Sequence, residues 1–210
     1  MESEHVLEVT VRRHVIDSER PFATVLQGIF DGISQPDIEK LFGQLAASTS
    51  YEDFSSLVRK AQGSVGLMRF MQLDLDQALT LDPQAPDWNG RRLVRLIAGN
   101  PVTMGTMTRH VADAGSYAPV TILIQELPGR ETQLANTAAS ATVPNRDAAG
   151  SQIARRLDIE VLGLLHLAAG RAGRASPPCA GSSRRGPGTA IACPTWPSTP
   201  QPAAGAGRRR

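Results

Sequence analysis

The composition of the chain changes abruptly after Gly170, and this break limits which residues can form a core. Residues 171–210 contain seven Pro, six Gly and seven Arg, with no Lys, Asp or Glu. Their only large apolar side chains are Ile191 and Trp196, too little apolar surface to offset the entropy lost on ordering. We therefore predict that 171–210 is a disordered tail. A GC-rich gene read in a shifted frame would give the same composition, so a natural tail and a frameshifted product are both open.

The charge of the preceding part argues against a nucleic-acid-binding fold. The net charge of the chain is +2, and removing the seven tail arginines leaves −5 for the first 170 residues. A fold that binds nucleic acid carries its own basic face. We therefore expect nucleic-acid contact, if any, only through the tail.

Cysteine usage and the N-terminus predict a cytoplasmic protein without a membrane span. Cys179 and Cys193 both lie in the tail, so neither a disulfide nor a thiolate metal site is expected in the fold. The N-terminus has acidic residues and no apolar core of signal-peptide length. No apolar run approaches the roughly 20 residues that cross a bilayer.

Hydrophobic periodicity predicts one α+β domain over residues 5–135, followed by a connection and a C-terminal amphipathic helix over 136–170. Alternating or continuous apolar runs predict strands, and apolar positions at helical spacing predict helices. Asp17 or Ser18 is expected to cap the first helix, and Ser34 to signal the second. The predicted strands cover about 5–16, 65–75, 93–98, 120–126 and 131–134, and the predicted helices begin near Pro21, Ser34, Ser50, Pro101 and Gln152.

The stretch Leu93-Val-Arg-Leu-Ile-Ala-Gly-Asn-Pro101, followed by Gly105-Thr106, resembles the prokaryotic family known as domain of unknown function 302. Upstream, Phe70-Met-Gln-Leu-Asp74 is similar to the family strand that ends in an acidic residue. Downstream, Tyr117-Ala-Pro119 leads into a strand, as in the family. The chain departs from the family pattern past Glu131, where it reads Leu134-Ala-Asn-Thr, and this weakens the prediction of the final strand.

The resemblance implies a mostly antiparallel sheet with helices packed on one face, a homodimer, and no established activity. Exposed sheet edges, which a twofold partner can cover, favour the same assembly.

The leading candidate site is the turn at Gly99, Asn100 and Pro101 with the helix that follows, including Gly105 and Thr106. A helix N-terminus offers unpaired N–H groups and a partial positive charge to an anion. A capped strand-to-helix turn explains the same residues, and we favour that interpretation, since Pro101 lacks one of the donors.

Three further residues complete the candidate ligand-binding set. Arg95 lies on the preceding strand, Asp74 at the end of the neighbouring strand, and His110 on the following helix. Each is also explained by exposure to solvent. No histidine pair has metal-ligand spacing, and no nucleophile or dinucleotide motif or cofactor signature is present, so the sequence leans against an enzyme and leaves any cofactor unknown.

Three functions are therefore considered, in this order. The first is a non-catalytic, dimeric module that binds a small ligand or anion around Gly99 to Thr106. The second is an enzyme that uses Asp74, His110 and Arg95 as acid/base groups. The third is an interaction protein whose basic tail contacts nucleic acid or membrane.

Overall fold

A computed structural model describes residues 4, 6, 8, 10–116, 118–141 and 147–171. The chain divides into two compact units, Met1–Ala175 and Ser176–Arg210. The second unit lies outside the described residues, as do Leu7 and Val9 of the first predicted strand and Tyr117 of the family motif. The predicted disordered tail, 171–210, is described only at Arg171.

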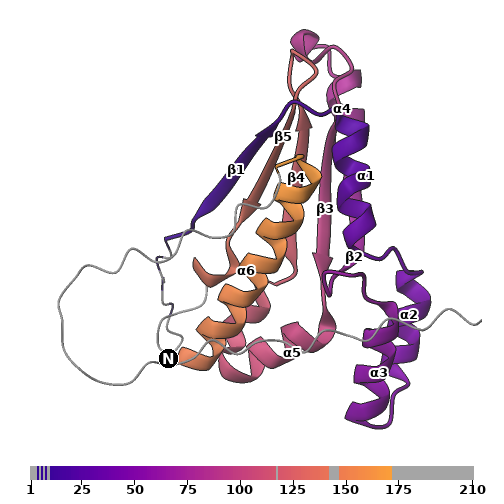
Figure 1. The fold of residues 1–210 in the computed structure, drawn as a ribbon, viewed down its shortest axis with the longest axis vertical. Helices are drawn as coiled ribbons and strands as arrows, with labels where there is room; N and C mark the ends of the chain where they lie inside the picture. Colours follow the sequence, from indigo (N-terminus) through magenta and orange to yellow (C-terminus); the bar gives the residue numbers. More distant parts are fainter. Residues whose placement is uncertain are drawn as a thin grey trace, which may run out of the picture. The chain divides into compact units, whose positions relative to one another are not determined.

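A five-stranded antiparallel sheet forms the centre of the first unit (Figure 1). Its strand order is β1-β5-β4-β3-β2, so the first strand pairs with the last. This confirms the predicted α+β class with an antiparallel sheet. The strands are β1 (Arg13–Ser18), β2 (Met68–Asp74), β3 (Leu93–Gly99), β4 (Val120–Glu126) and β5 (Thr132–Thr137).

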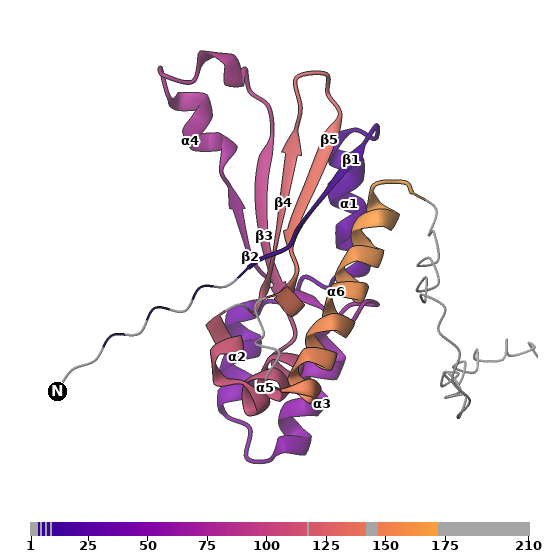
Figure 2. The ribbon, with the colours of Figure 1, turned by 90° about the vertical axis from the view of Figure 1, so that its left-hand side faces the viewer.

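Two helices cover one face of the sheet. In β3, Val94, Leu96 and Ala98 are completely buried and alternate with more exposed residues, the period-two pattern of a strand with one covered face. These side chains pack against α1 (Phe22–Gly32) and α6 (Ala148–Ala168) in one core. Both helices lie on the same side of the sheet in Figure 2, which confirms the predicted one-sided packing. The opposite face is here called the open face.

Three more helices gather at one end of the sheet, and one lies at the other end (Figures 1 and 2). The helices α2 (Ile38–Ala46) and α3 (Tyr51–Ala61) form a second, smaller apolar cluster that includes Val102 of α5 (Pro101–His110). At the opposite end, α4 (Asp76–Leu81) follows β2. Short 3₁₀ turns occur at Pro86–Trp88, Ala112–Ser116 and Ala139–Ala141.

Two helices have other N-cap residues than the sequence predicted. Asp17 and Ser18 belong to β1, and Ser18 donates a hydrogen bond to the Ala169 carbonyl instead of capping a helix. Pro21 occupies the N-cap of α1 without a capping side chain. Ser34 forms a bridge to β2, and Asp37 caps α2 by accepting from the backbone N–H of Lys40.

The last strand is present despite the departure from the family pattern. β5 pairs with both β1 and β4, and Leu134 is completely buried. The side chain of Asn136, also buried, donates to the Thr121 carbonyl of β4 at 3.0 Å. Apolar and hydrogen-bonding residues at alternate positions are therefore enough to form this strand.

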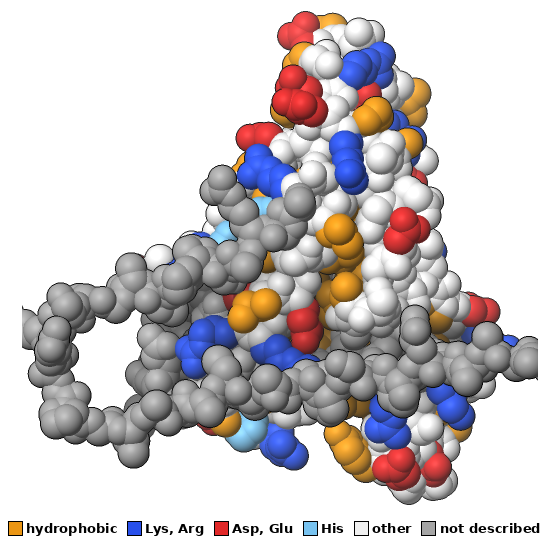
Figure 3. Space-filling view, in the orientation of Figure 1, with side chains coloured by type: hydrophobic (Ala, Val, Ile, Leu, Met, Phe, Trp, Pro, Cys, Tyr) orange, Lys and Arg blue, Asp and Glu red, His pale blue; other side chains and the backbone are white. Residues whose placement is uncertain are grey.

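Charged side chains of both signs are interspersed on the face drawn in Figure 3. Within the part of the chain that the structure describes, no helix combines the length and apolar character needed to cross a bilayer. Within that same part, no group of three or more His, Cys, Asp or Glu residues is arranged to hold a metal ion.

Candidate functional site

The turn between β3 and α5 is shaped by a close approach at Gly99. A Cβ atom there would lie 2.9 Å from a ring carbon of Phe70 and 3.0 Å from the Cβ of Pro119. Only glycine leaves room for both neighbours, so this position fixes how β3 meets β2 and the start of β4.

Asn100 uses its whole side chain to hold the start of α5. Its Oδ1 accepts from the backbone N–H groups of Val102 at 2.9 Å and Thr103 at 3.2 Å. Its Nδ2 donates to the Oε1 of Gln62 and to the carbonyl of Gly66, both at 2.8 Å. The residue is only 8% exposed. Asn100 therefore joins β3, α5 and the segment after α3.

This network leaves no N–H donor of the first turn for an anion among the described residues. Pro101 has no N–H. The next two N–H groups bond to Asn100 Oδ1, and the N–H of Met104 bonds to the Asn100 carbonyl at 2.9 Å. The geometry is that of a capped strand-to-helix turn, the simpler of the two interpretations drawn from the sequence.

A groove of about 580 Å³ lies beside α5, and we call it the α5 groove. Pro101, Gly105 and Arg109 occupy one side of the helix at intervals of four residues and form one wall. The α2–α3 connection and the start of α3 form the other. The described lining residues are Leu45, Ser48, Thr49, Ser50, Tyr51, Phe54, Pro101, Val102, Gly105, Thr106 and Arg109.

Two features keep the α5 groove open and polar at one end. A Cβ placed on Gly105 would meet no heavy atom within 4 Å. The guanidinium of Arg109 is exposed and has no hydrogen bond or ion pair to any other residue that the structure describes. The hydroxyl of Thr106 is committed, since it donates to the Val102 carbonyl at 2.8 Å.

A smaller groove of about 350 Å³ lies between α5 and α6 and includes Asn100 and Thr106 in its lining. Its charged residues neutralise each other, because Arg156 Nε lies 3.0 Å from Glu160 Oε1. This leaves less attraction for a charged ligand there than in the α5 groove.

His110 lies at the other end of α5, where it ties this helix to α6. Its Nδ1 is 3.4 Å from Asp147 Oδ2, and Asp147 caps α6 by accepting from the backbone N–H groups of Ala149 and Gly150. The Gly150 hydrogen bond is the main cause that lowers the pKa of Asp147, and His110 adds to it. His110 thus has a structural partner away from the α5 groove.

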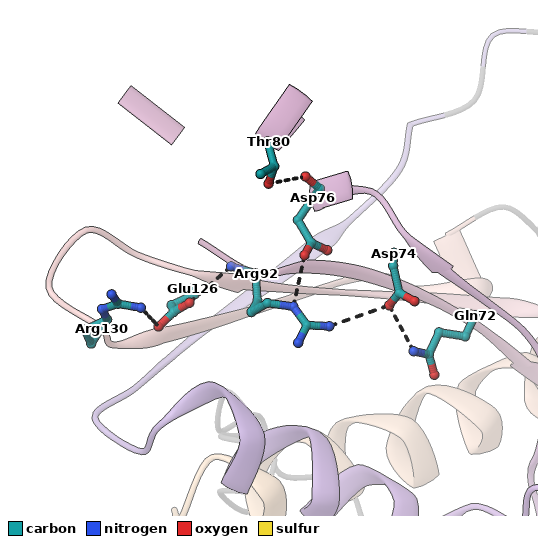
Figure 4. A network of polar contacts seen from close by, with 7 residues as sticks. All are labelled: Gln72, Asp74, Asp76, Thr80, Arg92, Glu126 and Arg130. Carbon is teal, nitrogen blue, oxygen red and sulfur yellow. Dashed lines mark hydrogen bonds and ion pairs between the residues drawn. The ribbon is translucent and has the colours of Figure 1, made fainter. Parts of the chain in front are cut away.

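Asp74 lies at the opposite end of the sheet from the turn. Asp74 pairs with Val94, whereas Gly99 pairs with Met68 at the other end of the same two strands. Figure 4 shows the polar network around Asp74.

Arg92 is the centre of that network. Its Nε lies 3.0 Å from Asp76 Oδ2, and its Nη2 lies 3.8 Å from Asp74 Oδ1 (Figure 4). Its backbone N–H donates to Glu126 Oε2, while Arg130 pairs with Glu126 Oε1 at 2.9 Å. Burial raises the pKa of Glu126, but the hydrogen bonds from Arg130 and Arg92, with the charges of these arginines, outweigh it, so the pKa is lowered.

Arg95 points away from the helices. It is paired in register with Leu73 of β2 and Leu123 of β4, so these three side chains share the open face. The side chain of Arg95 is exposed and has no hydrogen-bond or ion-pair partner among the described residues.

The structure therefore brings together only part of the set predicted from sequence. Pro101, Gly105 and Thr106 line the α5 groove, and Asn100 positions the helix that carries them. The other three polar candidates lie elsewhere: Arg95 on the open face, Asp74 at the far end of the sheet, and His110 beside α6.

Sequence reasoning missed Arg109, Phe54 and the hydroxyls of the α2–α3 connection as lining residues. The four-residue spacing of Pro101, Gly105 and Arg109 was a usable signal, because such residues share one side of a helix. No local pattern, however, indicates that α3 packs next to α5.

No protein-family model matches the chain, and no curated protein matches it. Among solved structures, the fold is similar to the crystal structure of an uncharacterized conserved protein DUF302 from Bacillus stearothermophilus, with 14% sequence identity and a TM-score of 0.47. The match covers 73% of this chain and 94% of that chain. The description of that protein names the same family that the sequence resembles.

Proposed function

We propose that this domain is a non-catalytic module that binds a small ligand in the α5 groove and works as a homodimer. The observation that carries the proposal is the unfilled space beside Gly105, where the helix that forms one wall of the groove has no side chain. A glycine in a helix costs stability, about 1 kcal/mol relative to Ala. Here it leaves space between the apolar side chains of Phe54 and Leu45 and the unpaired Arg109.

The dimensions and lining of the groove support binding of a small molecule. Small-molecule sites typically measure about 300 to 1,000 Å³ and combine an apolar lining with a few polar groups. The α5 groove, at about 580 Å³, has apolar Leu45, Phe54 and Val102, with hydroxyls and one guanidinium around them. A ligand with an apolar body and a hydrogen-bonding or anionic end fits this lining.

The same lining favours binding without turnover. Among the described residues of the groove there is no His, Asp, Glu, Cys or Lys, and the phenol of Tyr51 is on a side chain that is 70% exposed rather than enclosed with a ligand. Acid/base chemistry needs a titratable group within hydrogen-bond reach of the reacting atoms. Asp74 and His110, the predicted acid/base residues, both have protein partners outside the groove.

The homodimer is the second part of the proposal. The sheet ends in two edge strands, β1 and β2, whose outer sides can pair with another chain. On β2, Ser34 bonds to the neighbouring backbone only beside Met68, through the Leu67 carbonyl and the Arg69 N–H. Beyond Arg69, no described residue forms a hydrogen bond to the outer backbone of β2, so this part of the strand is available to a twofold partner.

Fragment screening by ¹H–¹⁵N NMR tests the ligand site. Fragments that bind are expected to shift the amides of Val102, Gly105 and Arg109. Gly105→Leu fills the groove and should abolish these shifts, since its side chain enters open space. Gly163→Leu in α6 is the matched control, because a Cβ there also meets nothing within 4 Å. Fragment binding that is equal in both variants, or absent from the α5 groove, would refute the proposal.

The tail-mediated function stays a prediction, because its residues lie outside the described part of the chain. Steep salt dependence of polyanion binding, lost on removing 171–210, would support it.

A further inference from the structure

The open face of the sheet has a cation, Arg95, in the middle of a row of apolar side chains. Side chains that are paired in register across all five strands form a single row, with Arg95 on β3. The row consists of Val15, Ala135, Leu123, Arg95 and Leu73.

On β2 and β3 the residues around this row extend the apolar surface, whereas on β4 and β5 the same face has Thr121, Gln125, Gln133 and Thr137. Along β3, Leu93 and Ile97 lie two positions before and after Arg95 and therefore on the same face. Met71, paired with Ile97, is 50% exposed, and Val15 at the edge is 51% exposed. Antiparallel sheets often leave one face in water, but such faces are normally polar. The β2–β3 side of this open face is instead apolar around a single arginine, the combination expected of a binding surface.

The open face is also hollowed. A trough of about 560 Å³ includes Arg95, Leu123 and Ala135 in its lining, with Arg13 from the edge strand β1 and no Asp or Glu among its described lining residues. Neither Arg95 nor Arg13 has a side-chain hydrogen bond or ion pair to another described residue. Both arginines therefore lack a protein counter-charge.

We propose that this trough is a second binding site, separate from the α5 groove, and that it takes a small monocarboxylate with an apolar body. The planar guanidinium of Arg95 matches a carboxylate through two parallel hydrogen bonds. The apolar body lies on Leu123 and Ala135. The attraction is enhanced beside an apolar floor, where the effective dielectric is lower than in water.

A second copy of the chain is the competing occupant of this face, and the observations favour the carboxylate. Covering Arg95 with the same apolar face would bury an arginine from each copy without a counter-charge, which is costly. Removing that charge would therefore strengthen self-association but weaken carboxylate binding. The two occupants thus predict opposite effects of one substitution.

The test uses the full chain and three probes that share one alkyl body: hexanoate, hexan-1-ol and hexylamine. Binding is followed by ¹H–¹⁵N NMR at the amides of Arg95, Leu123 and Ala135. We expect hexanoate to shift these amides, hexan-1-ol to bind more weakly, and hexylamine to leave them unchanged. Arg95→Gln should weaken hexanoate binding about tenfold or more, since it removes a charge-assisted bidentate contact.

Arg155→Gln is the matched control, because Arg155 is an exposed arginine of α6 whose side chain has no hydrogen bond or ion pair to any described residue. It should bind hexanoate like the unaltered chain. Arg95→Lys, which keeps the charge but loses the planar fork, should give an intermediate affinity. The Gly105→Leu variant should leave hexanoate binding at the open face intact, which separates this site from the α5 groove.

Three results would overturn the proposal. The first is no shift of the open-face amides with millimolar hexanoate. The second is equal binding of hexan-1-ol and hexanoate, because it would leave Arg95 without a role. The third is a gain in self-association of Arg95→Gln by light scattering, which would assign the face to a second copy.

Discussion

The side-chain amide of Asn100 donates a hydrogen bond of 2.8 Å to the side-chain oxygen of Gln62, which lies 38 residues earlier in the chain. The same side chain caps α5, so one buried residue holds two separate segments. Asn100→Ala should lower the free energy of unfolding by about 3 kcal/mol, because it removes a cap and leaves buried polar groups without partners.

Asp37→Ala is the comparison for this loss, measured by urea denaturation. Asp37 is exposed and caps α2 through one hydrogen bond, from Lys40 N–H. Its removal should cost about 1 kcal/mol. Equal losses for the two variants would mean that the bonds from Asn100 to Gln62 and Gly66 add nothing to stability.

Glu126 should make stability depend on acid pH. Its folded-state pKa lies below 4.5, the ordinary value for a glutamate in the unfolded chain. Its stabilising contribution is therefore complete above pH 4.5 and is lost as the pH falls through the folded-state pKa. Glu126→Gln should be less stable by about 1 kcal/mol at pH 7, a modest effect because Arg130 is largely exposed.

The difference between unaltered protein and Glu126→Gln should vanish at pH values below the folded-state pKa, where the glutamate is protonated. Urea denaturation at a series of pH values from 7 downward measures this. A difference that stays constant across the series would exclude the carboxylate charge as its cause.

Gly32 should be sensitive to a single added methyl group. A Cβ at this position in α1 would lie 2.5 Å from Leu164 Cδ1 of α6. Gly32→Ala is expected to cost about 1 to 3 kcal/mol through overpacking, reduced where Leu164 can change rotamer. Gly43→Ala in α2, where a Cβ meets nothing within 4 Å, should instead stabilise by up to about 1 kcal/mol. The melting temperatures of both variants test this contact. Equal changes in the two variants would mean that Gly32 of α1 does not lie against Leu164 of α6.

The proposed homodimer predicts a mass of two chains by multi-angle light scattering at tens of micromolar protein. Dilution should dissociate the dimer without unfolding either chain, since the first unit of each chain has its own hydrophobic core. A single-chain mass at all concentrations would contradict the proposal while leaving the α5 groove untouched.

Removing most of the tail should leave the fold almost unchanged. A chain that ends at Arg171 keeps the hydrogen bond from that guanidinium to the Asp17 carbonyl at 3.1 Å. We expect its melting temperature to lie within about 2 °C of the full chain, less than the shift from losing 1 kcal/mol in a domain of this size. A larger fall would show that Ile191 and Trp196 contribute to stability.

The sequence predicted those helix starts whose capping residue lies directly before the helix that it caps. Asn100 before Pro101 predicted the start of α5, and Ser50 predicted the cap of α3 by accepting from Asp53 N–H. Both signals lie within three residues of the helix they start.

Features that depend on distant partners were not predictable in the same way. Asp17 and Ser18 are good capping residues, but pairing with Gln133 and Thr132 of β5 places them in a strand. Asp74 is separated from the turn because β2 and β3 run antiparallel, and Arg95 because it lies four residues before Gly99 on β3 with its side chain on the open face. The sequence places all of these candidates close together along the chain, whereas strand pairing decides which of them meet.

The pairing of β1 with β5 has a consequence for synthesis on the ribosome. Arg13 is made well before its partner Thr137, which follows more than a hundred residues later. The hydrogen bonds of this edge cannot close until β5 has left the exit tunnel, and such distant contacts slow folding. Until then, β1 is an unpaired nascent strand, available to chaperones or to a neighbouring chain on the same messenger RNA.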